Sequence, residues 1–161
     1  MSAMVGEPSE KILAEASELA SREIGGTLAT MHSEDGTPYL TYVFFHLRES
    51  GEVLFASMGG PQHARNISAT PEVSFLIDNR EIIPESWDLF SRIVIEGRAE
   101  HVPKDDARFG PYLAELQSKD NQAARFIADH GDVYCIHPRR LIFRRGTEPL
   151  AQLIEFPVQG D

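Results

Sequence analysis

A succession of short apolar segments, separated by turn residues, constrains the fold of this chain more than any other feature. The strand-like segments are residues 26–32, 39–47, 53–58 and 73–78. They are rich in β-branched, aromatic or small residues, as is typical of strands. Residues 92–101 alternate apolar and polar side chains, which predicts a strand with one buried face. Turn signals such as Asp35-Gly36 lie between the segments and favour hairpins.

Helices are expected before the first strand and at the later connections. Ser9 caps an N-terminal helix within residues 1–25, whose apolar residues recur at helical spacing. Residues 103–131 are predicted to form a helical insert in two pieces, interrupted at Gly110-Pro111. Asn121 is the expected cap of the last helix in this insert.

The remaining sequence predicts two more strands, at residues 133–137 and 141–145, and the tail LAQLIEFP has the pattern of another. The chain has 161 residues, enough for one core, and contains no repeat or linker, so residues 1–161 are predicted to form a single domain. Hairpin-joined strands with helices at the connections indicate a small closed or nearly closed β-barrel. The fold class is therefore mainly β with flanking helices (α+β).

Composition excludes some classes of partner. The net charge of −10 argues against a nucleic-acid or anionic-membrane surface, because both need a basic patch. No apolar run is long enough to cross a membrane, and the polar start MSAMVGEPSEK is unlike a signal peptide, so a cytoplasmic location is expected. The one cysteine, Cys135, cannot form an internal disulfide, and its apolar neighbours favour a buried side chain over a reactive thiol.

Hydrogen-bond donors gather directly after the turn Gly59-Gly60-Pro61. The residues concerned are Gln62, His63, Arg65 and Asn66, at the start of a short helix. A helix start offers unpaired N–H groups and the positive end of a dipole to an anion. Two interpretations stay open: these side chains bind a phosphate group, or they cap the helix.

Arg92 and the phenylalanines also have two interpretations each. Arg92 faces either solvent or a ligand. Phe44, Phe45 and Phe55 are expected in the core rather than in the wall of an aromatic-ring pocket.

The sequence contains none of the common catalytic or metal-binding patterns. No two histidines form a close pair, and a single cysteine cannot supply a zinc pattern, so no metal site is predicted. The glycine turn lacks the Gly-Lys-Ser/Thr ending of a nucleotide triphosphate loop. There is no G-x-G-x-x-G turn for a dinucleotide and no G-x-S-x-G elbow for a serine nucleophile. No catalytic residue is assigned.

The order of the segments resembles the FMN-binding split-barrel family, which includes pyridoxamine 5′-phosphate oxidase. The matching blocks, within residues 26–146, are GTLAT, DGTPY, VFF, EVLFAS, HARNISATPEVSF and RIVIEGRAE. The block HARNISATPEVSF is the most specific, because the family shows a basic residue, a short helix, a proline and a VSL-like strand there.

The resemblance implies a six-stranded antiparallel split β-barrel and a homodimer with FMN in clefts at the subunit interface. It also implies that the second and third strands line the flavin ring, and that the phosphate lies after the glycine turn. The cofactor-binding residues implied in this way are Thr41, Tyr42, Val43, Phe44, Phe55, Ala56, Ser57, Gln62, His63, Asn66 and Arg92. Arg92 would lie near the pyrimidine edge of the flavin.

The chain departs from the family pattern at the positions expected to bind the phosphate. The family often has an arginine at the start of the second strand and an arginine–lysine pair after the glycine turn, whereas this chain has Leu40 and Gln62-His63. Fewer positive charges are therefore expected at the phosphate, and a partly charged His63 would make cofactor retention pH-sensitive. The basic ending with which pyridoxamine oxidases hold their substrate is missing after Gly146.

The resemblance implies an FMN-binding oxidoreductase that acts on a small-molecule substrate. Related branches of the family suggest alternatives: a protein that binds a cofactor without turnover, or one that binds heme or the deazaflavin F420. Heme would need an axial ligand, for which His101, His130 and His137 are candidates.

Overall fold

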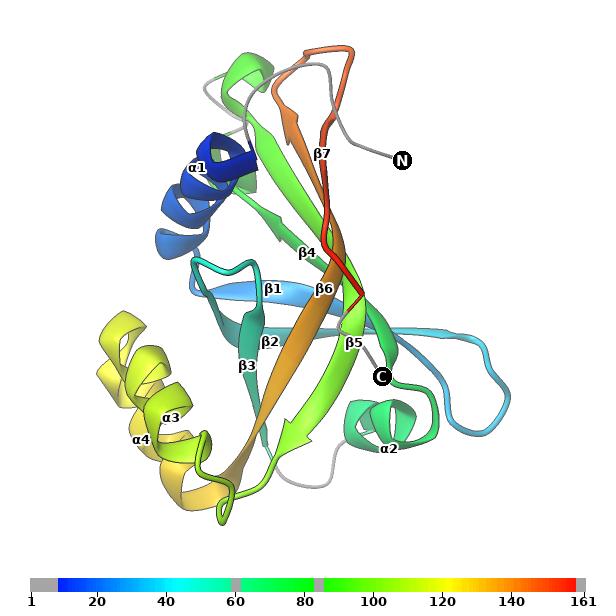
Figure 1. Cartoon of the computed structure of the whole chain (residues 1–161), viewed down its shortest axis with the longest axis vertical. Helices are drawn as coiled ribbons and strands as arrows, with labels where there is room; N and C mark the ends of the chain where they lie inside the picture. Colours follow the sequence, from blue (N-terminus) through cyan, green and yellow to red (C-terminus); the bar gives the residue numbers. More distant parts are fainter. Residues whose placement is uncertain (1–8, 59–61, 83–85, 159–161) are drawn as a thin grey trace.

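Antiparallel strands form a closed barrel in the computed structural model, which describes residues 9–58, 62–82 and 86–158. The strands are β1 (Gly25–Met31), β2 (Pro38–Leu47), β3 (Val53–Met58), β4 (Glu72–Asp78), β5 (Ser91–Val102), β6 (Gly131–Arg145) and β7 (Gln152–Glu155). Their order is β3-β2-β1-β4-β5-β6-β7, and a further β3–β6 pairing closes the first six into a barrel (Figure 1). This confirms the predicted six-stranded antiparallel barrel.

One long strand replaces the two predicted near the end of the chain. β6 runs without interruption across residues 131–145 and pairs with β5 along its length. Its first half also pairs with β3 and its second half with β7. Pro138 lies in β6 opposite Gly97, where the register shifts. A bulge at this position accommodates a proline without ending the strand.

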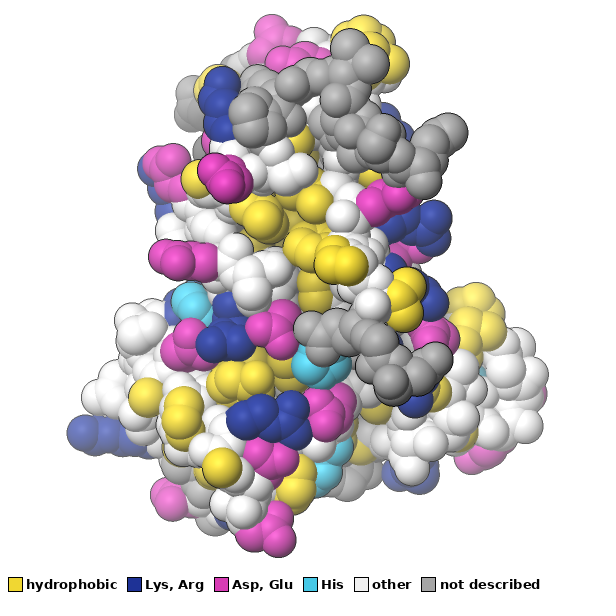
Figure 2. All heavy atoms as spheres, viewed as in Figure 1, with side chains coloured by type: hydrophobic (Ala, Val, Ile, Leu, Met, Phe, Trp, Pro, Cys, Tyr) yellow, Lys and Arg dark blue, Asp and Glu magenta, His cyan; other side chains and the backbone are white. Residues whose placement is uncertain are grey.

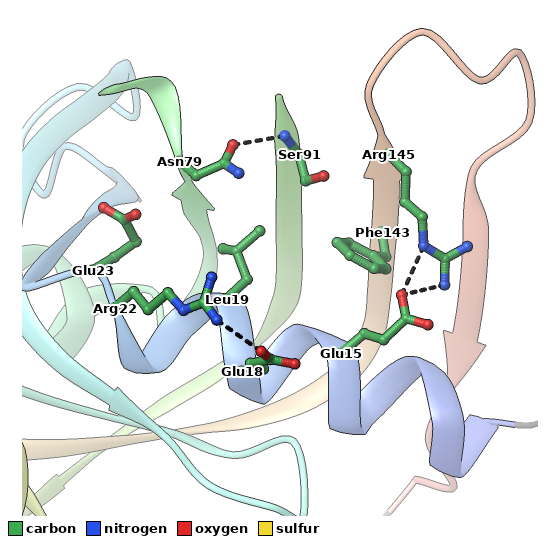
Figure 3. Close-up of a pocket in the computed structure, with 9 residues that line it drawn as sticks. All are labelled: Glu15, Glu18, Leu19, Arg22, Glu23, Asn79, Ser91, Phe143 and Arg145. Atoms are coloured by element: carbon green, nitrogen blue, oxygen red, sulfur yellow. Dashed lines mark hydrogen bonds and ion pairs between the residues drawn. The ribbon is translucent and has the colours of Figure 1, made fainter. Parts of the chain in front are cut away.

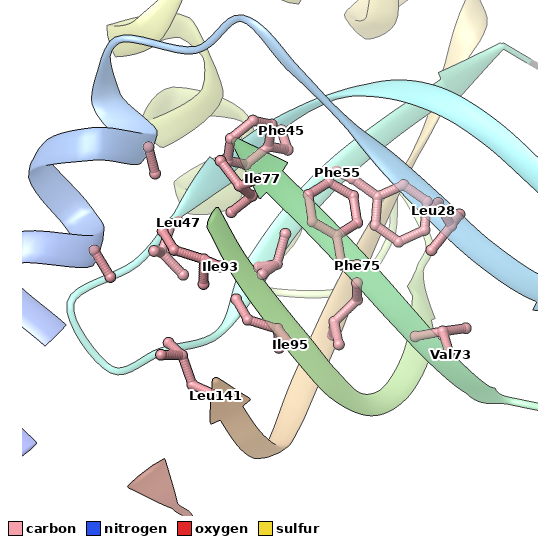
Figure 4. Packing of buried hydrophobic residues seen from close by; sticks show 14 of the residues in the cluster. Leu28, Phe45, Leu47, Phe55, Val73, Phe75, Ile77, Ile93, Ile95 and Leu141 are labelled. Carbon is pink, nitrogen blue, oxygen red and sulfur yellow. The ribbon is translucent and has the colours of Figure 1, made fainter. Parts of the chain in front are cut away.

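The barrel interior is filled by alternate side chains of the six strands (Figure 4). The rings of Phe45 and Phe75 pack at 5.2 Å near its centre. Gly26 is required beside them, because a β-carbon there would collide with the Phe75 ring. The strand alternation seen in the sequence therefore separates a dry interior from an outer face.

Helices cover different parts of the barrel. They are α1 (Ser9–Ser21), α2 (Gln62–Ala69), α3 (Phe109–Lys119) and α4 (Asn121–His130). Helix α1 contributes Ile12, Ala16 and Ala20 to the interior core. Helices α3 and α4 pack as a pair on the outside of β3 and β6, where they form a second apolar cluster (Figure 1).

The helical insert differs in one detail from the prediction. Gly110-Pro111 lies in the first turn of α3 and does not interrupt it, since proline is tolerated at a helix start. The chain breaks the helical conformation at Asp120, whose backbone is extended. Asn121, the expected cap, is instead the first residue of α4. None of the described helices is long and apolar enough to cross a membrane.

We expect Phe75→Ala to lower the free energy of unfolding by about 3–5 kcal/mol, because it empties a fully packed position. Urea denaturation followed by circular dichroism measures the effect. Leu150→Ala is the control, since Leu150 is 77% exposed, and it should change the stability by no more than about 0.5 kcal/mol. Equal effects of the two substitutions would contradict this assignment of the core.

Candidate functional site

The predicted cofactor residues of β2 lie on two faces of the barrel. Val43 is buried in the interior, and Thr41 is on the same side by alternation. Tyr42 points outward and is 66% exposed, and Phe44 packs beside the α3–α4 cluster. A ligand on the outer face would therefore meet the Tyr42 side chain and the backbone of its neighbours.

The predicted residues of β3 are buried in the single chain. Phe55 is fully buried and its ring stacks on Tyr134 at a centroid distance of 4.9 Å. Ala56 faces the α3–α4 cluster, and Ser57 is also buried. The interpretation of Phe55 as a core residue is confirmed, and none of these three side chains is exposed to a ligand outside the barrel.

Asn66 organises the polar corner at α2. Its Oδ1 accepts hydrogen bonds from the Ser33 amide and from Nε2 of Gln62, both at 2.8 Å. Its Nδ2 donates to the hydroxyl of Thr30 at 2.9 Å. Because Asn66 is completely buried and these bonds occupy its amide, it fixes α2 against β1 and the hairpin that follows β1.

Exposed polar groups surround Asn66. Gln62 donates to the hydroxyl of Ser33 at 3.1 Å, and the guanidinium of Arg65 donates to Oε1 of Gln62 at 2.6 Å. The turn Gly59-Gly60-Pro61, after which the phosphate is expected, lies outside the described residues. The corner therefore gathers an amide, a hydroxyl and a guanidinium at the first turn of a helix, which is the donor chemistry that a phosphate accepts.

His63 is buried beside Phe55, with 6.4 Å between the ring centroids. Its Nε2 has no hydrogen-bond partner among the described residues. Burial lowers the pKa of His63 below its ordinary value, because the charged ring would lose its hydration. Burial therefore disfavours the charged ring in the single chain, in contrast to the partly charged His63 expected from the sequence. An effect of His63 on cofactor retention stays a prediction.

An apolar row crosses the outer face of the barrel. It passes through Thr27 of β1, whereas the corner at α2 bonds Thr30 and Ser33, further along the same strand and in the hairpin after it. The strand register places Tyr42 beside Thr27, Thr27 beside Leu76, and Leu76 beside Val94. Leu40, which is 67% exposed, lies next to this row on β2. All these side chains belong to one face, since partners across a ladder point the same way.

Arg92 lies at the far side of the same face. It is next to Asp78 and Arg144 in the register, and its guanidinium lies 5.3 Å above the ring of Phe90. Three strand spacings separate β5 from β2 in the sheet order, a distance of about 14 Å. One chain alone therefore does not bring Arg92 together with Tyr42.

A separate cleft of about 370 Å³ lies between α1 and the ends of β4, β5 and β6 (Figure 3). Its charged groups are largely paired with one another: Arg145 with Glu15, and Arg22 with Glu18. None of the predicted cofactor residues lines this cleft.

A polar cluster that the sequence analysis missed lies at the other end of β3. It contains Glu52, Cys135 and His137, whose ligand atoms are within 4.8 Å of one another. Cys135 is buried, as predicted, and burial raises the pKa of its thiol to about 12. The sequence signal that could have predicted part of this cluster is the spacing of Cys135 and His137, because residues two apart on a strand share a face.

Comparisons with known proteins identify relatives of this chain. The family described as pyridoxamine 5′-phosphate oxidase matches residues 12–143. A comparison with curated proteins gives no significant match.

Solved structures share the fold at low sequence identity. A heme-binding protein from Mycobacterium smegmatis superposes with a TM-score of 0.75 at 22% identity, over 94% of this chain and 60% of that one. The heme storage protein of Vibrio cholerae gives a TM-score of 0.67 at 18% identity, over 88% and 92% of the two chains. A FAD-binding protein from Mesorhizobium loti gives 0.64 at 18% identity, over 84% and 93%.

Asn66→Ala should lower the free energy of unfolding by about 2–3 kcal/mol, because it leaves the Thr30 hydroxyl and the Ser33 amide without their partner. Chemical denaturation provides the measurement. Gln122→Ala, at an exposed position of α4, is the control and should have little effect. A neutral Asn66→Ala would show that the corner does not depend on this amide.

His63 should make the protein less stable in acid. Its pKa is lowered in the folded state relative to about 6.5 in the unfolded chain, so the unfolded state takes up a proton first as the pH falls below that value. We expect the loss of stability between pH 7 and pH 5 to be smaller in His63→Gln than in the wild type. Ser68→Ala, an exposed position on the same helix, should preserve the wild-type slope. If the pH dependence of stability is unchanged in His63→Gln, His63 is not the source of the loss of stability in acid.

Proposed function

The chain belongs to the pyridoxamine 5′-phosphate oxidase family, and from this premise we propose that it binds FMN between two copies of itself. The bound flavin would supply hydride or electron transfer to a small-molecule substrate. The observation that carries this proposal is the outer face of the barrel with the exposed side chains of Leu40 and Tyr42, in a chain that also has a phosphate-compatible corner at α2.

The apolar row supports a second copy as the covering layer. Leu40 and Tyr42 are large apolar side chains with two thirds of their surface in solvent, on the same sheet face as Leu76 and Val94. A sheet face of this kind gains free energy when another layer removes it from water. A second copy would also bring its own Arg92 to the flavin, which one chain alone does not achieve.

The corner at α2 supports the phosphate end of the cofactor. Gln62 and Arg65 present donors there, and the first turn of α2 adds backbone N–H groups. Asn66 would hold these groups in place and not touch the phosphate, because its own amide is occupied. Because burial disfavours the charged form of His63, Arg65 would be the main source of positive charge from this helix.

The roles of the other residues follow from their faces. Tyr42 would pack against the flavin ring and exclude water from it, while the backbone of β2 would supply hydrogen bonds to the ring edge. Arg92 of the second copy would stabilise negative charge near the pyrimidine edge. We assign no protein acid or base, so the flavin would be the only reactive centre.

Heme is the second candidate, because two of the similar structures are described as heme proteins. In this chain, Nε2 of His101 lies 3.2 Å from Asp132, and Nε2 of His137 lies 2.9 Å from Glu100. Neither histidine belongs to the apolar row on the outer face or to the corner at α2, which favours FMN over heme at the proposed site. The side chain of His130 lies outside the described residues.

We expect FMN to bind to the purified protein with saturable quenching of flavin fluorescence. Arg65→Ala should weaken binding by about 10-fold, because a charge-assisted hydrogen bond to the phosphate is lost. Ser68→Ala, exposed on the same helix, is the matched control and should bind FMN as the wild type does.

Parallel titrations with F420 and hemin identify the cofactor. If FMN does not show saturable binding and either F420 or hemin does, the proposal that the cofactor is FMN is wrong. Stopped-flow reduction of the bound flavin by NADH or NADPH separates an enzyme from a protein that only binds the cofactor. A flavin that stays oxidised with either donor would argue against the oxidoreductase.

Tyr42→Glu should convert a dimer to a monomer and abolish FMN binding together, because it places a charge in the proposed interface. Light scattering coupled to gel filtration measures the mass. Leu150→Glu adds the same charge at an exposed residue away from the barrel strands and should leave both properties unchanged. A Tyr42→Glu variant that stays dimeric would show that the dimer interface does not include the face that carries Tyr42.

A further inference from the structure

The cluster of Glu52, Cys135 and His137 lies on the outside of the barrel, where β3 and β6 begin to separate. Cys135 and His137 are on one face of β6, and Glu52 directly precedes β3. Figure 2 shows acidic, basic and histidine side chains intermingled on the face that β5 and β6 cross, next to the α3–α4 pair. Gln62 and the phosphate corner follow the opposite end of β3, so the two places are distinct.

The imidazole of His137 has one nitrogen engaged and one without a hydrogen bond. Nε2 lies 2.9 Å from Oε1 of Glu100, and that carboxylate also accepts two bonds from the guanidinium of Arg108. A carboxylate only accepts, so Nε2 carries a proton. In the neutral ring Nδ1 then presents a lone pair, whereas in the charged ring it would form an ion pair with Glu52. Nδ1 is buried and has no hydrogen-bond partner among the described residues.

The lone pair of His137 Nδ1 faces another acceptor. Oε2 of Glu52 lies 3.3 Å away, and the two atoms do not form a hydrogen bond. The thiol of Cys135 donates a hydrogen bond to the same oxygen, with 3.5 Å between Sγ and Oε2. Without a proton or a cation between them, the facing lone pairs of Nδ1 and Oε2 repel each other.

These separations match the edges of a coordination tetrahedron. Metal–ligand bonds of about 2.0–2.3 Å to nitrogen, oxygen and sulfur give edges of about 3.3–3.6 Å between ligand atoms. The Nδ1–Oε2 and Oε2–Sγ distances are 3.3 and 3.5 Å. The third edge, between Sγ and a ring nitrogen of His137, is no longer than 4.8 Å and would shorten on binding.

Neighbouring side chains hold the three ligands in position. Arg48 bonds Oε1 of Glu52 at 2.7 Å and leaves Oε2 to face the cluster. Glu100 fixes the ring of His137 in the manner of the carboxylates that support metal-bound histidines. The side chains of His137 and Glu52 retain 28% and 18% of their surface, so one edge of the cluster borders solvent.

We propose that Glu52, Cys135 and His137 bind one divalent transition-metal ion of the zinc type, with water as the fourth ligand. The thiol releases its proton to solvent on binding, so that thiolate and carboxylate balance the two positive charges of the ion. Soft sulfur and imidazole ligands select such an ion over magnesium or calcium, which prefer oxygen.

Cobalt(II) titration of the full chain, without an affinity tag, tests the site. One equivalent should produce a thiolate-to-cobalt charge-transfer band and the visible bands of a tetrahedral ion, and zinc should displace it. Cys135→Ser should abolish the charge-transfer band, and His137→Asn should weaken binding by about 10-fold or more. Since Cys135 is fully buried, circular dichroism is needed to check that Cys135→Ser folds. If this variant does not fold, His137→Asn still tests the site, because His137 is partly exposed.

The matched control is His101→Asn. His101 also pairs with a carboxylate on the neighbouring strand but has no cysteine beside it, and its loss should leave the cobalt spectrum unchanged. Glu100→Gln should lower affinity without removing the charge-transfer band, because the histidine is the one proposed ligand that Glu100 contacts. A wild-type protein without this band, or a folded His137→Asn that binds cobalt as the wild type does, would overturn the proposal. The result is independent of FMN binding.

Discussion

Pairing of β3 with β6 is the interaction on which the rest of the structure depends, because it closes the sheet into a barrel. Closure encloses Phe55 and Tyr134, whose stacked rings fill the interior between these two strands. It creates the outer surface on which α3 and α4 pack. It also brings Glu52 next to His137, which are far apart in the sequence.

Closure also divides each strand between a core face and an outer face, and this division assigns the roles of the candidate residues. Side chains that face inward, such as Val43 and Phe55, stabilise the barrel and are not available to a ligand outside it. Side chains that face outward, such as Tyr42, stay exposed until another layer covers them. The proposed cofactor and the proposed second copy are thus two parts of one explanation for the same exposed face.

Local patterns in the sequence predicted the strands well, because alternation and turn residues act over a few positions. Features that depend on distant partners were not predictable. Pro138 continues a strand only because Gly97, on another strand, forms a bulge opposite it. Asn66 was open to two roles until its partner Thr30 was placed. The Cys-x-His spacing places Cys135 and His137 on one face of a strand. The third member of the cluster, Glu52, joins them only through the β3–β6 pairing, which the sequence does not reveal.

We propose that two copies of the barrel share bound flavin at the face that carries Tyr42. Sedimentation velocity, recorded at both a protein and a flavin wavelength, measures the mass of the species that carries the flavin. We expect the flavin signal to move with a dimer that carries two flavins. Flavin that sediments with a monomer, or a dimer from which flavin is absent at saturating FMN, would refute this arrangement.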